Sequence, residues 1–241
     1  MATKPADVSR PHSGFRREPS AANSEAVQDY AKAIHALAER GGGPVQTSAL
    51  AERLGVSPGS VTAMLKRMGD LGLVSHEPYH GVTLTKSGNQ VALEVIRHHR
   101  LIEAYLAEAL GMPWDRVHDE AEVLEHYISE ELEERLASAL GDPSHDPHGD
   151  PIPDRDLELG SDEGVALAGL EPGEGGIFSR VSDSDPEMLR YLAERGIKPG
   201  AALVIRERQP FGGPVFVEVG GGEHAIGGEL AERMLIEVTP E

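Results

Sequence analysis

The sequence predicts a mainly α-helical protein with a small β-domain at its C-terminal end. Apolar residues recur at helical spacing up to about residue 140, whereas short β-branched runs broken by Gly and Pro fill the chain from Val165 onward. A stretch rich in Asp, Pro and Gly separates the two parts. The expected order is a disordered tail (residues 1–22), a winged helix-turn-helix (23–85), a second helical domain (86–141), a linker (142–163) and a small barrel (164–241).

Composition limits the class of protein and the kind of metal site. The chain has 241 residues, enough for two or three small domains with real cores. No apolar run approaches the roughly 18–20 residues of a membrane span, and residues 1–22 lack the apolar segment of a signal peptide, so we expect a cytoplasmic protein without a membrane partner. Because there are no cysteines, any metal must be held by His, Asp, Glu, Met or backbone oxygen.

Charge is distributed unevenly along the chain. The net charge is −19, which argues against nonspecific binding of nucleic acid by the whole surface. Residues 101–163 carry 19 acidic and 3 basic side chains, whereas residues 41–100 carry 4 acidic and 6 basic ones. The acidic average is therefore compatible with a DNA-facing end in the first third of the chain.

Three helices and a hairpin are expected in that first third. Helices are predicted over residues 24–39, 47–54 and 57–71, because apolar residues recur on one face of each and glycines follow them. The runs 73–77 and 82–84 flank a turn and predict a β-hairpin. Helix, tight turn, helix and hairpin are the layout of a winged helix-turn-helix, although the turn by itself is also typical of an ordinary helix corner.

The helix over residues 57–71 is the predicted DNA-reading element. Its first turn carries small side chains, which let the backbone approach phosphates and thymine methyl groups. With few long polar side chains there, we expect methyl contacts and DNA shape to provide much of the specificity. The expected DNA contacts are Ser57, Gly59, Ser60, Thr62, Ala63, Lys66, Arg67 and, at the wing, His80.

The second helical domain carries an unusual set of His and Glu residues. Helices are predicted over residues 85–110, 113–127 and 129–140, and Val117, Ala121 and Leu124 are the expected buried stripe of the middle one. His99 and Glu103 are spaced i and i+4, so they share one face of the first helix.

A second stripe on the middle helix consists of His118, Glu122, Glu125 and His126, and it spans about 12 Å at 1.5 Å per residue. Bonds between metal and ligand are about 2.0–2.3 Å long, so one ion cannot use both ends of that stripe.

Two separate metal sites are therefore inferred. One joins His118 to His99 and Glu103, and the other uses Glu122, Glu125 and His126 with a further ligand, for which Asp29 on the first helix is the candidate. Solvated salt bridges on an acidic surface are one alternative. A small metalloenzyme is another, but the chain has no Ser/His/Asp order, no His-Glu-x-x-His motif and no Gly-rich phosphate loop, so we do not expect an enzyme.

Four segments resemble the diphtheria toxin repressor family of metal-dependent regulators. They are RHHRLIEAYL (97–106), VHDEAEVLEH (117–126), DPHGDPIP (146–153) and VSDSDPEMLRYLAERGI (181–197), and the resemblance covers about residues 24–238. It implies a transcriptional repressor that binds palindromic operator DNA as a homodimer, controls metal uptake and homeostasis genes, needs no small-molecule substrate and ends in an SH3-like, FeoA-like domain.

The resemblance also implies which residues hold which ion. His99, Glu103 and His118 match the family's ancillary site, and Asp29, Glu122, Glu125 and His126 match its primary site. The SH3-like domain supplies two further side chains near the ancillary ion in the family. Their counterparts here are Arg180, which cannot be a ligand, and Asp183.

The choice of metal is inferred from two positions in the primary site. Iron-responsive members carry Met and Cys where this chain has Asp29 and Glu122, and carboxylate oxygen favours the harder Mn(II) over Fe(II). We therefore expect a manganese-responsive repressor with two Mn(II) sites per chain. The alternatives are an Fe(II)-responsive or promiscuous repressor, with Co(II) or Zn(II) as further ions. Lys32 stands where some short manganese regulators carry a Glu that makes a binuclear site.

Overall fold

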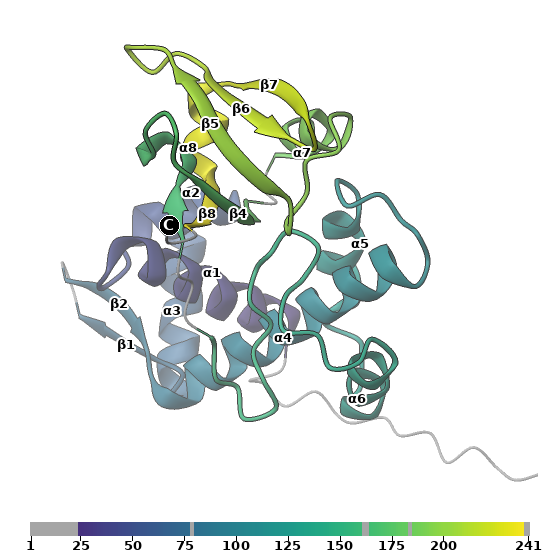
Figure 1. Cartoon of the computed structure of the whole chain (residues 1–241). Coiled ribbons are helices and arrows are strands. Elements are labelled where there is room, and N and C mark those ends of the chain that lie inside the picture. Colours follow the sequence, from purple (N-terminus) through teal and green to yellow (C-terminus); the bar gives the residue numbers. More distant parts are fainter. Residues whose placement is uncertain (1–23, 78–79, 161–163, 183–184, 239–241) are drawn as a thin grey trace, which may run out of the picture.

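The computed structural model describes residues 24–77, 80–160, 164–182 and 185–238, and its fold class is the predicted one. The N-terminal part consists of α1 (Glu25–Gly41), α2 (Thr47–Leu54), α3 (Pro58–Asp70) and a hairpin of β1 (Val74–Glu77) and β2 (Gly81–Leu84) (Figure 1). Fully buried side chains of all three helices form its core, among them Ile34, Leu50 and Met68. These elements agree with the predicted ones to within two residues at each end.

A long central helix connects this part to the rest of the molecule. α4 (Lys86–Glu108) packs against α1 on one side and against α5 (Val117–Leu124) and α6 (Glu130–Ala139) on others. Its N-terminus is capped by Thr85, whose hydroxyl accepts a hydrogen bond from the Gly88 N–H at 3.1 Å. No helix in the described ranges is both long and apolar enough to cross a membrane.

The helix predicted over residues 113–127 is shorter than expected. It begins at Val117, because Trp114 is packed into the hydrophobic core of the C-terminal domain and residues 114–116 form a turn instead. Val117 and Ala121 are buried as predicted, but Leu124 is 41% exposed, so its assignment to the buried stripe was wrong.

The C-terminal domain is one antiparallel sheet with two short helices. Its strands are β3 (Val165–Ala166), β4 (Gly175–Val181), β5 (Ala202–Arg208), β6 (Val215–Val219), β7 (Gly222–Ile226) and β8 (Met234–Val238), in the order β3-β8-β4-β5-β6-β7. The helices are α7 (Pro186–Ala193) and α8 (Gly228–Arg233), and a short 3-10 turn, η2 (Leu167–Gly169), follows β3. β3 has only two residues, which are too few to show an alternating pattern in the sequence.

The segment predicted as a linker is packed against both parts. Asp146, His148 and Asp150 are buried, and the Val181 N–H donates to the His148 carbonyl at 2.9 Å. Asp150 pairs with Arg180 of β4 at 2.6 Å and with Arg100 of α4 at 3.3 Å. The segment therefore fastens the C-terminal sheet to the central helix.

Gly149 offers a test of this junction. Its φ is +87°, and a Cβ atom there would lie 1.9 Å from the Ser179 carbonyl oxygen on β4. We expect Gly149→Ala to lower the free energy of unfolding by about 3 kcal/mol, since backbone must move. Gly111→Ala is the matched control, because Gly111 has a φ of +67° but no atom within 4 Å of its Cβ position, and should cost about 1 kcal/mol. Urea denaturation measures both, and equal losses would contradict a close approach at Gly149.

Candidate metal centre and DNA-reading face

Three helices bring the predicted metal ligands together. α4 contributes His99 and Glu103, α5 and the turn after it contribute the stripe that begins at His118 and ends at His126, and α1 contributes Asp29. α1 belongs to the DNA-reading part, whereas α4 and α5 form the second helical domain. The candidate metal centre therefore lies where these two parts meet.

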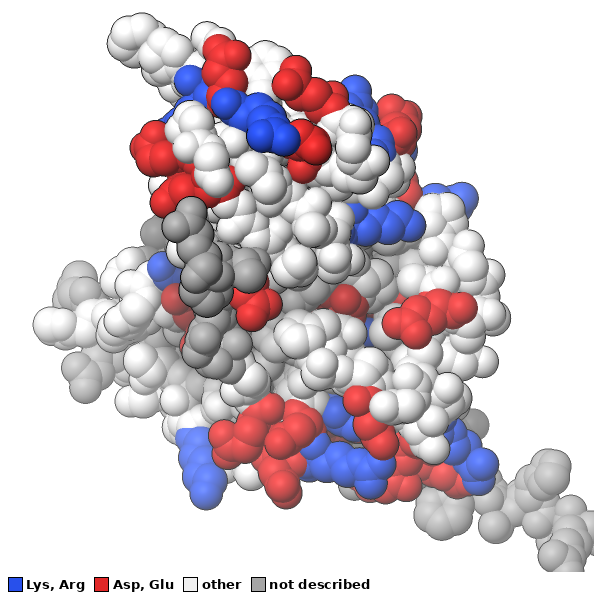
Figure 2. Space-filling view, viewed as in Figure 1, with Lys and Arg blue, Asp and Glu red and all other residues white. Residues whose placement is uncertain are grey.

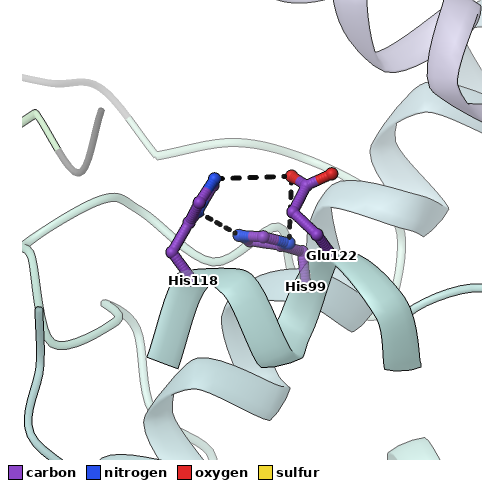
Figure 3. A group of neighbouring side chains, drawn as sticks. All are labelled: His99, His118 and Glu122. Atoms are coloured by element: carbon purple, nitrogen blue, oxygen red, sulfur yellow. Dashed lines mark hydrogen bonds and ion pairs between the residues drawn. The ribbon is translucent and has the colours of Figure 1, made fainter. Parts of the chain in front are cut away.

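The first cluster contains the residues of the predicted ancillary site. His99 Nε2 lies 3.0 Å from Glu103 Oε1 and 3.2 Å from His118 Nδ1, and His118 Nδ1 lies 3.3 Å from Glu103 Oε1. Glu122 reaches the same cluster: its Oε1 lies 3.6 Å from His118 Nε2 and 3.8 Å from His99 Nδ1. Figure 3 shows His99, His118 and Glu122 pointing toward one another from two helices.

The second cluster joins α1 to the end of α5. His126 Nε2 lies 3.1 Å from Asp29 Oδ1 and 3.7 Å from Glu125 Oε1. On its other side, His126 Nδ1 lies 2.8 Å from Gln28 Oε1. With that amide oxygen as acceptor, Nδ1 carries the proton and Nε2 offers its lone pair to the cluster. Gln28 was not among the predicted residues, because a single Gln next to a candidate ligand carries no distinct sequence signal.

Lys32 of α1 fills the space between the two clusters. Its Nζ lies 2.7 Å from Glu122 Oε1, 2.8 Å from Glu125 Oε2 and 3.1 Å from His99 Nδ1. Glu122, which was predicted to face Asp29, is held toward Lys32 and the two histidines. An ammonium group thus neutralises carboxylates that are the predicted metal ligands.

Protons complete this neutralisation. Burial by itself lowers the pKa of His99, but the carboxylates of Glu103 and Glu125 outweigh it and raise the pKa to about 9. Burial raises the pKa of Glu103, yet the surrounding histidines hold it well below its usual range. The cluster therefore has the electrostatic character of a cation site: anionic oxygens held in place around exchangeable positive charge.

The last predicted ligand, Asp183, lies outside the described residues. Arg180, whose position is the other family counterpart in this domain, is turned toward Asp150.

The predicted DNA contacts are exposed to solvent. The Ser57 hydroxyl caps α3 by accepting from the Ser60 N–H at 3.1 Å, and Thr62 donates to the Pro58 carbonyl at 3.0 Å. The side chains of α3 that were predicted to contact DNA are all exposed, as is His80 at the hairpin. Figure 2 shows acidic side chains along both the upper and the lower edge of the molecule, where they are mixed with Lys and Arg. The first turn of α6 holds Glu130, Glu131 and Glu133.

Three protein-family models match successive parts of the chain. The iron-dependent repressor N-terminal DNA-binding domain matches residues 23–82, the iron-dependent repressor metal-binding and dimerisation domain matches residues 85–154, and the FeoA domain matches residues 165–238.

Relatives match over nearly the full length. The iron-dependent repressor IdeR of Mycobacterium tuberculosis is 31% identical over 225 residues, covering 88% of this chain and 97% of its own. The diphtheria toxin repressor of Corynebacterium efficiens is 31% identical, covering 88% and 95%.

Among solved structures, a manganese-dependent transcriptional repressor in complex with manganese has a TM-score of 0.79 and 39% identity, covering 88% of this chain and 99% of its own. The manganese regulator SloR has a TM-score of 0.69 and 32% identity, covering 88% and 98%. These relatives are DNA-binding repressors and not enzymes. The chain belongs to the diphtheria toxin repressor family of metal-dependent transcriptional repressors.

Proposed function

We propose that this repressor responds to Mn(II) and binds a palindromic operator as a homodimer when two ions per chain are bound. The observation that carries the proposal is the convergence of Asp29, Glu125 and His126, one residue from the DNA-reading part and two from the second helical domain. The ligand set is oxygen-rich and contains no sulfur, which favours Mn(II) over softer ions. Two relatives of known structure are named for manganese, one as a manganese-dependent transcriptional repressor and the other as the manganese regulator SloR.

The proposed ligands divide between two ions. The primary ion is assigned to Asp29, Glu122, Glu125 and His126, and the ancillary ion to His99, Glu103 and His118. For the primary set to close, Glu122 turns away from Lys32 toward Asp29, and its 43% exposed side chain has room to do so. Deprotonation of His99 accompanies ligation, because its pKa of about 9 leaves it cationic without metal.

The proposed mechanism couples the ligands to the placement of α3. When bound, a divalent ion neutralises the clustered carboxylates. Asp29 then ties α1, and α2 and α3 that pack with it, to the end of α5. If the two α3 helices of a dimer are held at one spacing, the dimer favours a palindromic site of matching spacing. The metal ion can promote DNA binding only because it binds more tightly to the protein in that arrangement.

Comparing wild type with Glu122→Ala tests this function. Operator binding by wild type is expected to require Mn(II), and the variant is expected to bind weakly at every Mn(II) concentration. Metal-independent binding of equal strength by both proteins would contradict the proposal.

Exposed apolar side chains on α5 and α6 and in the turn between them support a dimer interface on this part of the helical domain. Val123 is 62% and Tyr127 71% exposed, and Leu124 and Leu132 lie on the same helical domain. We expect Val123→Asp to shift the protein from dimer to monomer in analytical ultracentrifugation, because a charge would be buried between subunits. Val204→Asp, on the C-terminal sheet, is the control for an exposed valine. A Val123→Asp protein that remains dimeric would place the interface elsewhere.

An Fe(II)-responsive repressor is the second candidate, because curated relatives such as IdeR are named for iron. The double change Glu122→Cys with Asp29→Met should raise the response to Fe(II) relative to Mn(II) by introducing soft ligands. Anaerobic operator-binding titrations with each ion measure the ratio. An unchanged ratio would show that geometry elsewhere determines the metal.

A further inference from the structure

A third group of possible ligands lies next to the first cluster and shares Glu103 with it. It consists of Glu103 of α4 with Asp146 and His148 of the segment that connects α6 to the C-terminal sheet. Glu103 and His148 are completely buried, and Asp146 is 7% exposed. The two clusters that correspond to the predicted ancillary and primary sites use neither Asp146 nor His148.

Hydrogen bonding determines which nitrogen of His148 carries a proton. Its Nε2 lies 2.8 Å from the Trp114 carbonyl oxygen, which can only accept, so Nε2 is the protonated nitrogen. Nδ1 points toward Glu103 Oε2 at 3.7 Å and Asp146 Oδ1 at 3.9 Å, both beyond hydrogen-bond distance. His148 Nδ1 and Glu103 Oε2 have no hydrogen-bond partner among the described residues. A lone pair therefore faces two carboxylate oxygens inside the protein, an arrangement that needs a cation between them.

The spacing fits a metal ion better than a proton. Ligand atoms about 2.0–2.3 Å from a metal lie about 3–4 Å from one another, which matches the separations of Nδ1 from the two oxygens. A proton shared by nitrogen and oxygen would draw them to about 2.7–2.9 Å.

The loop holds one ligand in position by backbone contacts. Asp146 Oδ1 accepts hydrogen bonds from the N–H groups of His148 at 2.8 Å and Asp150 at 2.9 Å. The carboxylate is thus placed by its own turn before any ion arrives, which lowers the entropic cost of binding.

We propose that Glu103, Asp146 and His148 form a third divalent-cation site, separate from the primary and ancillary sites. The inference rests on the proposed function only through Glu103, whose Oε1 faces His99 and His118 while its Oε2 faces His148. A nitrogen and two carboxylates suit Mn(II), Fe(II) or Zn(II).

Such a site would act on the C-terminal domain. His148 accepts from the Val181 N–H at the end of β4, and Asp150 pairs with Arg180 of the same strand. An ion at Asp146 and His148 ties that loop to Glu103 on α4. The bound ion therefore makes the attachment of the C-terminal sheet to the helical domain metal-dependent.

Counting Mn(II) bound per chain after equilibrium dialysis tests the site. Asp146→Asn keeps the oxygen that accepts both backbone hydrogen bonds but loses the charge, and it should bind one ion fewer than wild type. His148→Gln should behave in the same way and provides an independent variant. Asp154→Asn is the matched control, because Asp154 Oδ1 accepts the same pattern of N–H groups, from Asp156 and Glu158, away from any cluster, and it should bind as many ions as wild type.

Combining variants separates this site from the ancillary one. His118→Ala should lose the ancillary ion, and His118→Ala with Asp146→Asn should lose two ions. Equal counts in wild type, Asp146→Asn and His148→Gln would overturn the third site, as would a double variant that binds as many ions as His118→Ala. An ion lost from Asp146→Asn but none lost from His118→Ala would support the third site and contradict the ancillary one.

Discussion

Replacing Glu125 with Gln is expected to lower Mn(II)-dependent operator affinity by about 100-fold, the upper end of couplings measured between linked sites. Glu125 is almost fully buried, and its carboxylate contacts Lys32 and His99 and lies 3.7 Å from His126 Nε2. Among the described residues of the candidate centre, Glu125 is the carboxylate that both pairs with Lys32 and lies near His126. Loss of its charge should therefore remove the metal response altogether.

Fluorescence anisotropy with labelled operator DNA measures this effect. Glu120→Gln is the control, since Glu120 lies on the exposed side of the same helix and its neutralisation should leave affinity within about twofold. Circular dichroism of both variants checks that the helices are retained. A folded Glu125→Gln protein that responds to Mn(II) as wild type does would exclude Glu125 from the metal centre.

Lys32→Met is expected to raise the affinity for Mn(II) by about tenfold, the effect of removing roughly 1.4 kcal/mol of repulsion. The Lys32 ammonium lies 2.7–2.8 Å from oxygens of Glu122 and Glu125, so it competes with the ion for the same ligands. Without Lys32 the carboxylates repel one another in the metal-free protein, which should also lower its thermal stability. Lys32→Met is therefore expected to lower the stability of the metal-free protein and to raise the affinity of the protein for Mn(II).

Isothermal titration calorimetry with Mn(II) measures the affinity, and thermal unfolding in the presence of a chelator measures the stability of the metal-free protein. Lys86→Met, an exposed lysine at the start of α4, removes the same charge away from the cluster and should change neither quantity appreciably. Weaker Mn(II) binding by Lys32→Met would show that Lys32 positions the ligands instead of competing with the ion.

Helical periodicity predicted much of the candidate site. The i and i+4 spacing of His99 and Glu103 and the stripe from His118 to His126 were enough to indicate two clusters, because side chains on one helical face must meet the neighbouring helix. Asp29 also lies where it was expected, 3.1 Å from His126. Spacing on a helix is a local property, so it could be read without the tertiary fold.

Other features depend on contacts between distant segments. Nothing local indicates that Lys32 places its ammonium between Glu122 and Glu125, 90 and 93 residues along the chain. Trp114 shortens α5 because it enters the core of a domain that begins some fifty residues later. His148 stands in a stretch whose Asp, Pro and Gly content predicted a linker, although the segment is packed and buried.

Mn(II) and operator DNA are proposed to favour the same state of the protein, and titrating the wild-type protein with Mn(II) in the presence and absence of operator measures whether they do. Linkage requires the operator to raise Mn(II) affinity by the same factor by which Mn(II) raises operator affinity. We expect both factors to exceed about tenfold and to agree with each other. Equal Mn(II) affinity with and without operator would contradict it, because an ion that does not distinguish the two states cannot control the binding of DNA.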